Sequence, residues 1–197
     1  MSNPAFERDS TEDISAMTPL PEGYRFEHMR QADIRPLIEA IREWFPSVSV
    51  GAASCYLTEH FYLDKVVIDG EADRDVIVLL VKKGGEIVGM GSWERESAAM
   101  TLYARLGVIA PAHRRARLAV LAMELGEKMG RVMGAGFIYT LATMKMPQMQ
   151  LALERAGYQL IGFMPGYDRE ELSPGVVQAE GYDVRLKGLL SVSSSIY

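Results

Sequence analysis

The spacing of hydrophobic side chains changes several times along this chain, and these changes constrain the fold more than any other feature. Residues 32–45 and 117–133 carry apolar side chains three and four positions apart, which predicts amphipathic helices. Residues 75–94 contain two apolar runs around a Gly-Gly pair, the pattern of a strand hairpin. From residue 100 onward a strand, a turn, a helix and a strand succeed one another. This order predicts an α/β domain on a mixed sheet.

Further elements are expected on both sides of this unit. The aromatic-rich segment 51–67 is predicted to form one helix, and residues 147–156 a short one that Pro147 opens and Gly157 ends. The sheet should be mostly antiparallel and flanked by helices, in a single domain. A loop is expected at 165–181. The other predicted strands are residues 24–29, 100–110, 136–143, 158–164 and 182–190.

Length and composition limit the class of protein. The 197 residues are 48% hydrophobic and 24% charged, the balance of one globular domain. We expect a flexible arm at 1–22, a domain at 23–190 and a tail at 191–197. The arm lacks the apolar core of a secretory signal, and no stretch approaches the roughly 18 to 20 apolar residues that span a bilayer. No membrane partner is therefore expected.

Charge and cysteine content narrow the choice further. The net charge of −5 argues against general nucleic-acid binding. The single cysteine, Cys55, cannot form an internal disulfide, so the cytoplasm is the expected location. A structural thiol is favoured there over a nucleophile, because no His-plus-carboxylate pattern accompanies it. His28 and His60 are isolated, and no spacing of ligating residues suits a metal, so no metal cofactor is expected.

Positive charge is concentrated where the helix 117–133 begins. His113, Arg114, Arg115 and Arg117 fall between a predicted strand and that helix. The first amide N–H groups of a helix and its dipole attract anions, above all phosphate, and arginines add bidentate donors. A solvated loop is the alternative interpretation. The placement between strand and helix favours a site for one compact anion.

The segment from LGVIAPAHRRARLAVL to LERAGYQLIGF resembles the coenzyme A-binding half of the GNAT acyltransferases, which are acetyl-CoA-dependent N-acetyltransferases. In that family a bulged strand ends in Val-x-Pro, which matches Ile109-Ala110-Pro111. A loop of the form Arg/Gln-x-x-Gly-x-Gly/Ala follows, and residues 114–119 take its place. The resemblance extends over most of residues 24–190. It implies a coenzyme A site made by Val108, Ile109, His113, Arg114, Arg115, Ala116, Arg117, Leu118 and Ala119.

Three positions depart from the family pattern. Arg117 replaces the middle glycine of the loop, and Leu153 stands where many members have a tyrosine acid. Tyr103 stands where some members have a glutamate base. We name Glu94 as the candidate base and Tyr103 as the candidate proton donor, with Tyr139 as an alternative donor. An exposed glutamate and packed tyrosines are the structural alternatives.

The resemblance implies an N-acyltransferase that moves an acetyl or other acyl group from acyl-CoA directly to an amine of a small molecule or peptide. Backbone N–H groups near Val108 and Ile109 would polarise the thioester carbonyl. A coenzyme A-binding or regulatory module without turnover is the alternative. A longer acyl chain or a carrier-protein thioester is a third reading. Acceptor specificity is expected from the first two helices and the loop 165–181, and a homodimer is left open.

Methionines are frequent between residues 129 and 149. They could line a channel for the pantetheine arm or the acyl group, because methionine adapts its shape to its surroundings. Ordinary core packing is the favoured interpretation. The residues concerned are Met129, Met133, Met144, Met146 and Met149.

Overall fold

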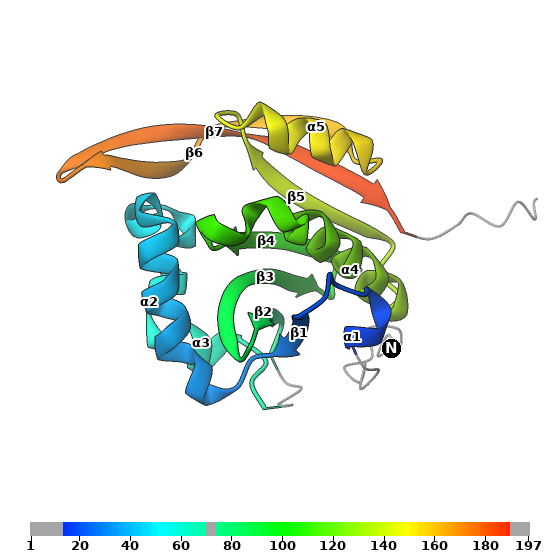
Figure 1. Ribbon diagram of the computed structural model, residues 1–197. Coiled ribbons are helices and arrows are strands. Elements are labelled where there is room, and N and C mark those ends of the chain that lie inside the picture. Colours follow the sequence, from blue (N-terminus) through cyan, green and yellow to red (C-terminus); the bar gives the residue numbers. More distant parts are fainter. Residues whose placement is uncertain (1–13, 70–73, 190–197) are drawn as a thin grey trace, which may run out of the picture.

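The computed structural model describes residues 14–69 and 74–189 of the chain. Seven strands form one sheet in the order β1-β2-β3-β4-β5-β7-β6 (Figure 1). Of the paired strands in this order, only β4 and β5 run parallel. The mixed, mostly antiparallel sheet is therefore confirmed. The strands are β1 (Tyr24–His28), β2 (Val76–Lys83), β3 (Glu86–Glu96), β4 (Thr101–Ile109), β5 (Phe137–Thr143), β6 (Gln159–Ser173) and β7 (Val176–Gly188).

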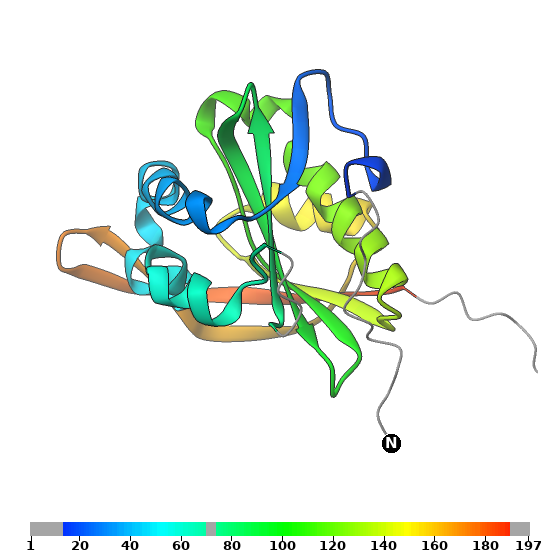
Figure 2. The same ribbon diagram turned by 90° about the horizontal axis from the view of Figure 1, so that it is seen from below.

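Helices cover both faces of this sheet, as Figures 1 and 2 show. Buried side chains of α2 (Ile34–Trp44) and α3 (Glu59–Lys65) form one core cluster with one face of the strands. Buried side chains of α4 (Leu118–Val132) and α5 (Pro147–Arg155) form the other core cluster with the opposite face. We call these the α2 face and the α4 face.

The predicted hairpin between β2 and β3 is present. Gly84 and Gly85 make its turn with φ of 58° and 93°, a backbone region that side chains with a Cβ rarely adopt. Residues 76–81 of β2 are buried without interruption, as expected for a strand covered on both faces.

A buried tryptophan sets the distance between α4 and the sheet. Trp93 of β3 is 3% exposed, and its indole lies against the backbone of Gly126 in α4. A Cβ at Gly126 would collide with the indole nitrogen, so only glycine allows this close approach. The contact holds α4 over β3 and β4 and thereby places the start of the helix at the end of β4.

The single helix predicted for residues 51–67 is wrong. The structure has two 3₁₀ turns, Pro46–Val50 and Ala52–Leu57, before α3 begins at Glu59. Thr58 interrupts the segment with an extended backbone, φ −121° and ψ 132°. Burial of the rings of Tyr56 and Tyr62 in the α2-face core outweighs the local helical preference.

The predicted loop at 165–181 is also wrong. Strands β6 and β7 continue through it and meet at a turn around Gly175, where φ is 78°. The long hairpin extends past the sheet toward α2 (Figure 2). Three shifts of register between β6 and β7 mark bulges, which bend a strand without ending its pairing.

Part of the predicted flexible arm packs against the domain. Residues 14–17 form the short helix α1, and Met17 and Leu20 contact the α4-face core. Thr18 is 1% exposed, and Lys128 of α4 donates a hydrogen bond to the carbonyl of Met17. Residues 1–13 of the arm and the tail at 191–197 lie outside the described residues.

Candidate functional site

The two parallel strands of the sheet separate part-way along their length. β4 and β5 pair from Thr101 with Phe137 to Ala104 with Thr140. Thr140 Oγ1 donates a hydrogen bond to the Ala104 carbonyl at 3.0 Å at the point where the pairing ends. Beyond it, the edge of β4 that faces β5 is left open to bind an extended ligand through its backbone.

A bulge in β4 lies at this point of separation. Gly91 of β3 pairs with Gly107 and Trp93 pairs with Ala104, so two β4 residues, Arg105 and Leu106, lie opposite Ser92. A bulge turns the strand and re-aims its backbone groups. The bulge predicted near Val108 and Ile109 is therefore present two or three residues earlier.

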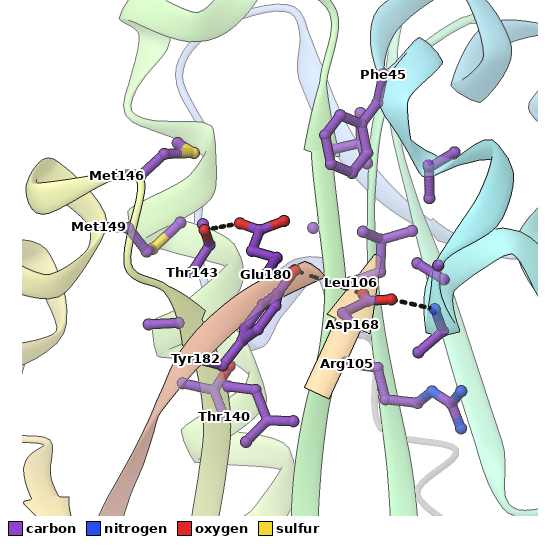
Figure 3. Close-up of a pocket in the computed structure, with 18 of the residues that line it drawn as sticks. Phe45, Arg105, Leu106, Thr140, Thr143, Met146, Met149, Asp168, Glu180 and Tyr182 are labelled. Carbon is purple, nitrogen blue, oxygen red and sulfur yellow. Dashed lines mark hydrogen bonds between the residues drawn. The ribbon is translucent and has the colours of Figure 1, made fainter. Parts of the chain in front are cut away.

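A pocket of about 560 Å³ occupies the space between the separated strands (Figure 3). The end of β4, from Arg105 to Ile109, forms one wall, and residues 140–143 of β5 form part of another. Met149 and Leu153 of α5 enter from the α4 face. Trp44 and Phe45, at the end of α2, contribute from the α2 face. The pocket therefore reaches between the layers of the fold.

The basic segment forms an ordered turn at one side of this pocket. Residues 111–116 make a 3₁₀ turn, and Arg117 follows in the left-handed region with φ 59° and ψ 16°. Helix α4 begins at Leu118, and the side chain of its N-cap residue, Arg117, makes no capping hydrogen bond. These amides, with arginines beside them, have the chemistry of a phosphate site. A helix start at this point confirms the predicted strand–turn–helix order.

Six of the nine predicted cofactor residues occupy three kinds of position, of which Leu118 alone represents the third. Val108, Ile109 and Arg114 line the pocket. Arg115 and Arg117 are exposed on the turn beside it. The third group packs inward: Leu118 is 0% exposed and lies in the α4-face core.

Contacts of the turn hold it against distant elements. Arg114 donates hydrogen bonds to the carbonyls of Ile109, at 3.2 Å, and of Trp44, at 3.3 Å. The Tyr24 hydroxyl and His113 Nδ1 are 2.8 Å apart, with the two rings edge to face. Ala116 packs partly against the core, whereas Ala119 is exposed.

The candidate base does not reach the pocket. Glu94 lies at the end of β3 opposite Tyr103, and its carboxylate forms an ion pair with Arg105. Arg105 lines the pocket and Glu94 does not. The arginine therefore stands between the carboxylate and the space that a substrate would occupy.

The candidate proton donor does reach the pocket. The ring of Tyr103 lines it and stacks on Tyr139, with centroids 4.7 Å apart and planes 3° from parallel. Burial raises the pKa of Tyr103, and Tyr167 contributes to the same direction. Tyr103 thus keeps its hydroxyl proton at neutral pH. Tyr139 donates its own proton in a 2.6 Å hydrogen bond to Glu96.

Several pocket residues were not identified from the sequence, and all but Tyr182 lie in the segment 165–181, for which a loop was expected. Tyr167, Asp168, Glu180 and Tyr182 line the pocket from the β6–β7 hairpin. The Ser-Pro-Gly turn signal at 173–175, between stretches of β-forming residues, could have indicated a hairpin. No local pattern indicated that these side chains would reach β5.

Sequence comparisons leave the chain without a match, both among family models and among curated proteins. Solved structures do match. A mutant spermidine/spermine N-acetyltransferase SpeG from Vibrio cholerae superposes with a TM-score of 0.68 and 11% identity, over 86% of this chain and 95% of that one. Ard1 from Thermoplasma volcanium gives 0.63 and 13%, over 86% and 99%. A putative phosphinothricin N-acetyltransferase gives 0.64 and 13%, over 85% and 99%.

The chain has the GNAT fold. The order of elements, the β4 bulge and the separation of β4 from β5 are thus features of the architecture that the sequence resemblance implied. At 11–13% identity these similarities show the fold alone. The chemistry of the pocket depends on the residues that line it in this chain.

The methionines between residues 129 and 149 lie in two environments, the core and the pocket wall. Met129 and Met133 are 1% and 6% exposed and belong to the α4-face core, as favoured from the sequence. Met146 and Met149 line the pocket, and Met146 is 49% exposed. Met144 is 50% exposed. Flexible thioether side chains at the pocket wall suit a ligand of variable shape.

Residues 14–69 and 74–189 contain neither a candidate metal site nor a candidate membrane span. No group of three His, Cys, Asp or Glu side chains in these ranges is placed to hold a metal ion. No helix in them is long and apolar enough to cross a membrane. Cys55 is half-buried, and burial raises the pKa of its thiol.

Proposed function

We propose that this chain is an N-acyltransferase that moves an acetyl or other acyl group from acyl-CoA to an amine by direct transfer. One observation carries the proposal: the pocket between β4 and β5 lies beside a basic turn at the start of α4. An extended, partly apolar molecule that ends in a pyrophosphate would match both parts together.

The donor would lie along the edge of β4 with its phosphates at the turn. Arg114 and the first amides of α4 would contact the pyrophosphate, with the exposed Arg115 and Arg117 at its rim. Met149 and Leu153 would contact the pantetheine arm from the α4 face. The arginines, the helix amides and the apolar side chains together therefore suit an acyl-coenzyme A, which supplies an activated thioester when bound.

The acceptor would enter from the α2 face. A neutral amine would attack the thioester carbonyl, whose oxygen would accept hydrogen bonds from β4 backbone N–H groups at the bulge. Tyr103, which lines the pocket and keeps its proton, would protonate the leaving thiolate, and the proton released by the attacking nitrogen would restore the Tyr103 hydroxyl through water. Holding both substrates together would supply much of the rate.

A coenzyme A-binding module without turnover is the second candidate. Leu153 offers no proton at the position where many GNAT enzymes have a tyrosine. Glu94 is engaged by Arg105 and does not line the pocket. Both observations favour binding without chemistry.

Calorimetric titration with acetyl-CoA, followed by thiol-release assays over a panel of amines, separates the candidates. An enzyme binds acetyl-CoA and releases thiol with at least one amine, whereas a module binds without release. Arg114→Ala and Arg115→Ala should each weaken binding by about 1–3 kcal/mol. Arg35→Ala is the matched control, because Arg35 of α2 forms an exposed ion pair with Glu59 of α3 and does not line the pocket. Unchanged affinity in both turn variants would contradict the proposed phosphate site.

The acyl donor, the oligomeric state, the cellular location and the type of acceptor are further parts of this proposal. The acyl donor could be a longer acyl-CoA or a carrier-protein thioester, which the same titration can compare with acetyl-CoA. A homodimer is testable by light scattering, and β6 leaves apolar side chains such as Leu160 and Phe163 exposed at the sheet edge. A cytoplasmic location and a peptide acceptor remain predictions.

A further inference from the structure

The guanidinium of Arg105 lies among three aromatic rings at the wall of the pocket. Its central carbon is 5.8 Å from the ring centroids of Tyr56, Phe61 and Tyr103. Arg105 lines the pocket, and its side chain is 22% exposed (Figure 3). A cation within about 6 Å of a ring centroid interacts with the face of that ring. The positive charge is therefore held mostly inside the pocket wall.

The bulge of β4 places Arg105 beside the proposed reacting centre. Arg105 and Leu106 are the two residues opposite Ser92, and both side chains lie on the α2 face. In a regular strand two consecutive side chains point to opposite faces, so the shared face is a consequence of the bulge. Arg105 thus belongs to the segment whose backbone N–H groups are proposed to bind the thioester carbonyl.

Neighbouring groups fix the guanidinium of Arg105 in place. Glu94 of β3 forms an ion pair with it and is 33% exposed. The Tyr56 hydroxyl lies 2.5 Å from Ser92 Oγ, and both residues are buried, so the ring beside the guanidinium is fixed as well. Nη2 of Arg105 contacts Cys55 Sγ at 4.0 Å. A charge held in a partly buried place acts more strongly on its neighbours than a charge in water.

Tyr103 is the neighbour on which this charge has a chemical effect. Burial raises the pKa of Tyr103, and Tyr167 and Tyr139 act in the same direction, whereas Arg105 acts in the opposite one. A buried phenol gives up its proton reluctantly, because the phenolate that is left is poorly solvated. A nearby positive charge stabilises that phenolate and so eases the proton transfer that the proposed reaction requires.

We propose that Arg105 assists proton donation by Tyr103: its guanidinium stabilises the negative Tyr103 oxygen when the proton passes to the leaving thiolate, and Glu94 weakens this effect by pairing with the same guanidinium. This inference rests on the acyltransferase function proposed above. In this step the O–H bond of Tyr103 breaks and an S–H bond forms on the departing coenzyme A. A proton from the attacking nitrogen then returns to the Tyr103 oxygen through water. Arg105 acts through Tyr103 and exchanges no proton itself.

Neutral variants of the two charged residues test this role, because they should act in opposite directions. Arg105→Gln removes the positive charge and should lower the single-turnover rate of thiol release about tenfold or more. Glu94→Gln frees the guanidinium and should raise the rate by about two- to threefold. Arg105→Lys keeps a positive charge and should retain most of the rate. An ion pair that only holds the bulge would instead lose activity alike when either partner is neutralised.

A second ion pair supplies the matched controls. Arg35 of α2 and Glu59 of α3 form an exposed ion pair, and neither residue lines the pocket. Arg35→Gln and Glu59→Gln should therefore leave the rate of thiol release unchanged. Circular dichroism and melting temperatures report whether each variant is folded.

A spectroscopic probe measures the effect of the charge without any turnover. 2,3,5-Trifluorotyrosine in place of Tyr103 keeps the ring and the hydroxyl but ionises at lower pH than tyrosine, and its fluorine NMR signal reports the ionisation of this one side chain. The midpoint of the titration should rise by about one pH unit or more in Arg105→Gln and should fall in Glu94→Gln. Arg35→Gln should leave it in place.

An unchanged midpoint in folded Arg105→Gln would overturn this inference, and so would equal losses of rate in Arg105→Gln and Glu94→Gln. Thiol release by the wild-type chain is the separate readout of the proposed function. If thiol is released and the midpoint does not respond to Arg105, the proposed function stands and this inference alone fails. If no amine supports thiol release, the proposed function fails and this inference fails with it, whatever the titration shows.

Discussion

Arg117 combines a side chain with a backbone conformation that usually belongs to glycine. Its φ of 59° is one of three positive φ values among the described non-glycine residues. The backbone of the turn therefore follows the course that a glycine would allow, although the sequence has an arginine. Left-handed backbone costs an L-residue roughly 1–2 kcal/mol. Such strain persists where the surroundings or a function require it.

Replacing Arg117 by glycine should separate strain from charge. Arg117→Gly should raise the melting temperature by about 2–4 °C, because it relieves about 1 kcal/mol of backbone strain. It should also weaken acetyl-CoA binding by about 1–2 kcal/mol through loss of the guanidinium. Calorimetry at fixed salt and thermal melts measure both effects. Arg117→Lys, which keeps the strain and the charge, should change neither by much. Tighter binding by the glycine variant would favour the module without turnover.

Tyr103, which lines the pocket, is the proposed proton donor. Tyr103→Phe should lower kcat by about 100-fold and leave KM nearly unchanged, because the stacked ring remains and only the hydroxyl is lost. Steady-state kinetics with any productive amine measures this effect. Tyr139→Phe is the control, since its hydroxyl is bound to Glu96 and should contribute little. Equal losses in both variants would point to disturbed stacking instead of proton transfer.

The segment before β1 behaves as part of the domain at the scale of secondary-structure elements. Met17 and Leu20 contact the α4-face core and Thr18 is buried, so the chain from residue 14 onward covers α4. This arrangement changes the expectation for truncations. Removal of residues 1–20 would be harmless for a flexible arm, but not for a segment with these contacts.

Deletion of residues 2–22 should lower the free energy of unfolding by about 2–4 kcal/mol, because two partly buried apolar side chains and their contacts are lost. For a chain of this size that corresponds to a fall in melting temperature of about 5–15 °C. Deletion of residues 2–13, which have little apolar sequence, is the control and should change it little. Differential scanning calorimetry distinguishes these outcomes. Equal melting temperatures for the two truncations would show that α1 contributes no stability.

The β6–β7 hairpin contacts the segment between α2 and α3, on the face from which the acceptor is proposed to enter. Asp168 receives the amide of Ala52, and Gly51 lies so close to Asp168 that a Cβ there would collide with its carboxylate. The hairpin is therefore fastened to the 3₁₀ turns after α2. This contact brings Glu180 and Tyr182 into the same pocket as Phe45.

At the scale of the whole molecule, the proposed donor and acceptor sites lie on different faces of the sheet. The basic turn begins α4, whose buried side chains pack on one face, while the carboxylates of the hairpin line the pocket from the other. The sheet opens between them where β4 leaves β5. If both proposed sites bind their ligands, donor and acceptor would be held at the same time, as direct transfer requires.

Acetyl-CoA should stabilise the entire domain, because it would bridge β4 and α4 only in the folded state. At a concentration of 100 times Kd the gain is about 2.7 kcal/mol, which corresponds to a rise in melting temperature of about 5–10 °C. Thermal melts over a concentration series measure it. The rise should be smaller in Arg114→Ala and unchanged in Arg35→Ala. A melting temperature that does not respond to acetyl-CoA would contradict the proposed donor site.

Local patterns in the sequence were sufficient for much of this fold. Apolar spacing determined α2, α4 and the central strands, and Gly84-Gly85 determined the hairpin turn, because these signals act over a few neighbouring residues. The charge at 113–117 indicated an anion site for the same reason. The single helix predicted for the aromatic segment 51–67 was wrong, because burial of its rings depends on residues distant in the sequence.

The pocket itself was decided by tertiary structure. The separation of β4 from β5, the pairing of Glu94 with Arg105 and the approach of Glu180 to Thr143 all join residues far apart in the chain. Charge and burial at such positions depend on which strands become neighbours, and no short window of sequence contains that information. The amino-acid sequence thus indicated the turn at which an anion site is proposed. Only the folded sheet brought a buried carboxylate to the opposite side of the same pocket, because β7 lies beside β5 and not beside the strands that precede it in the chain.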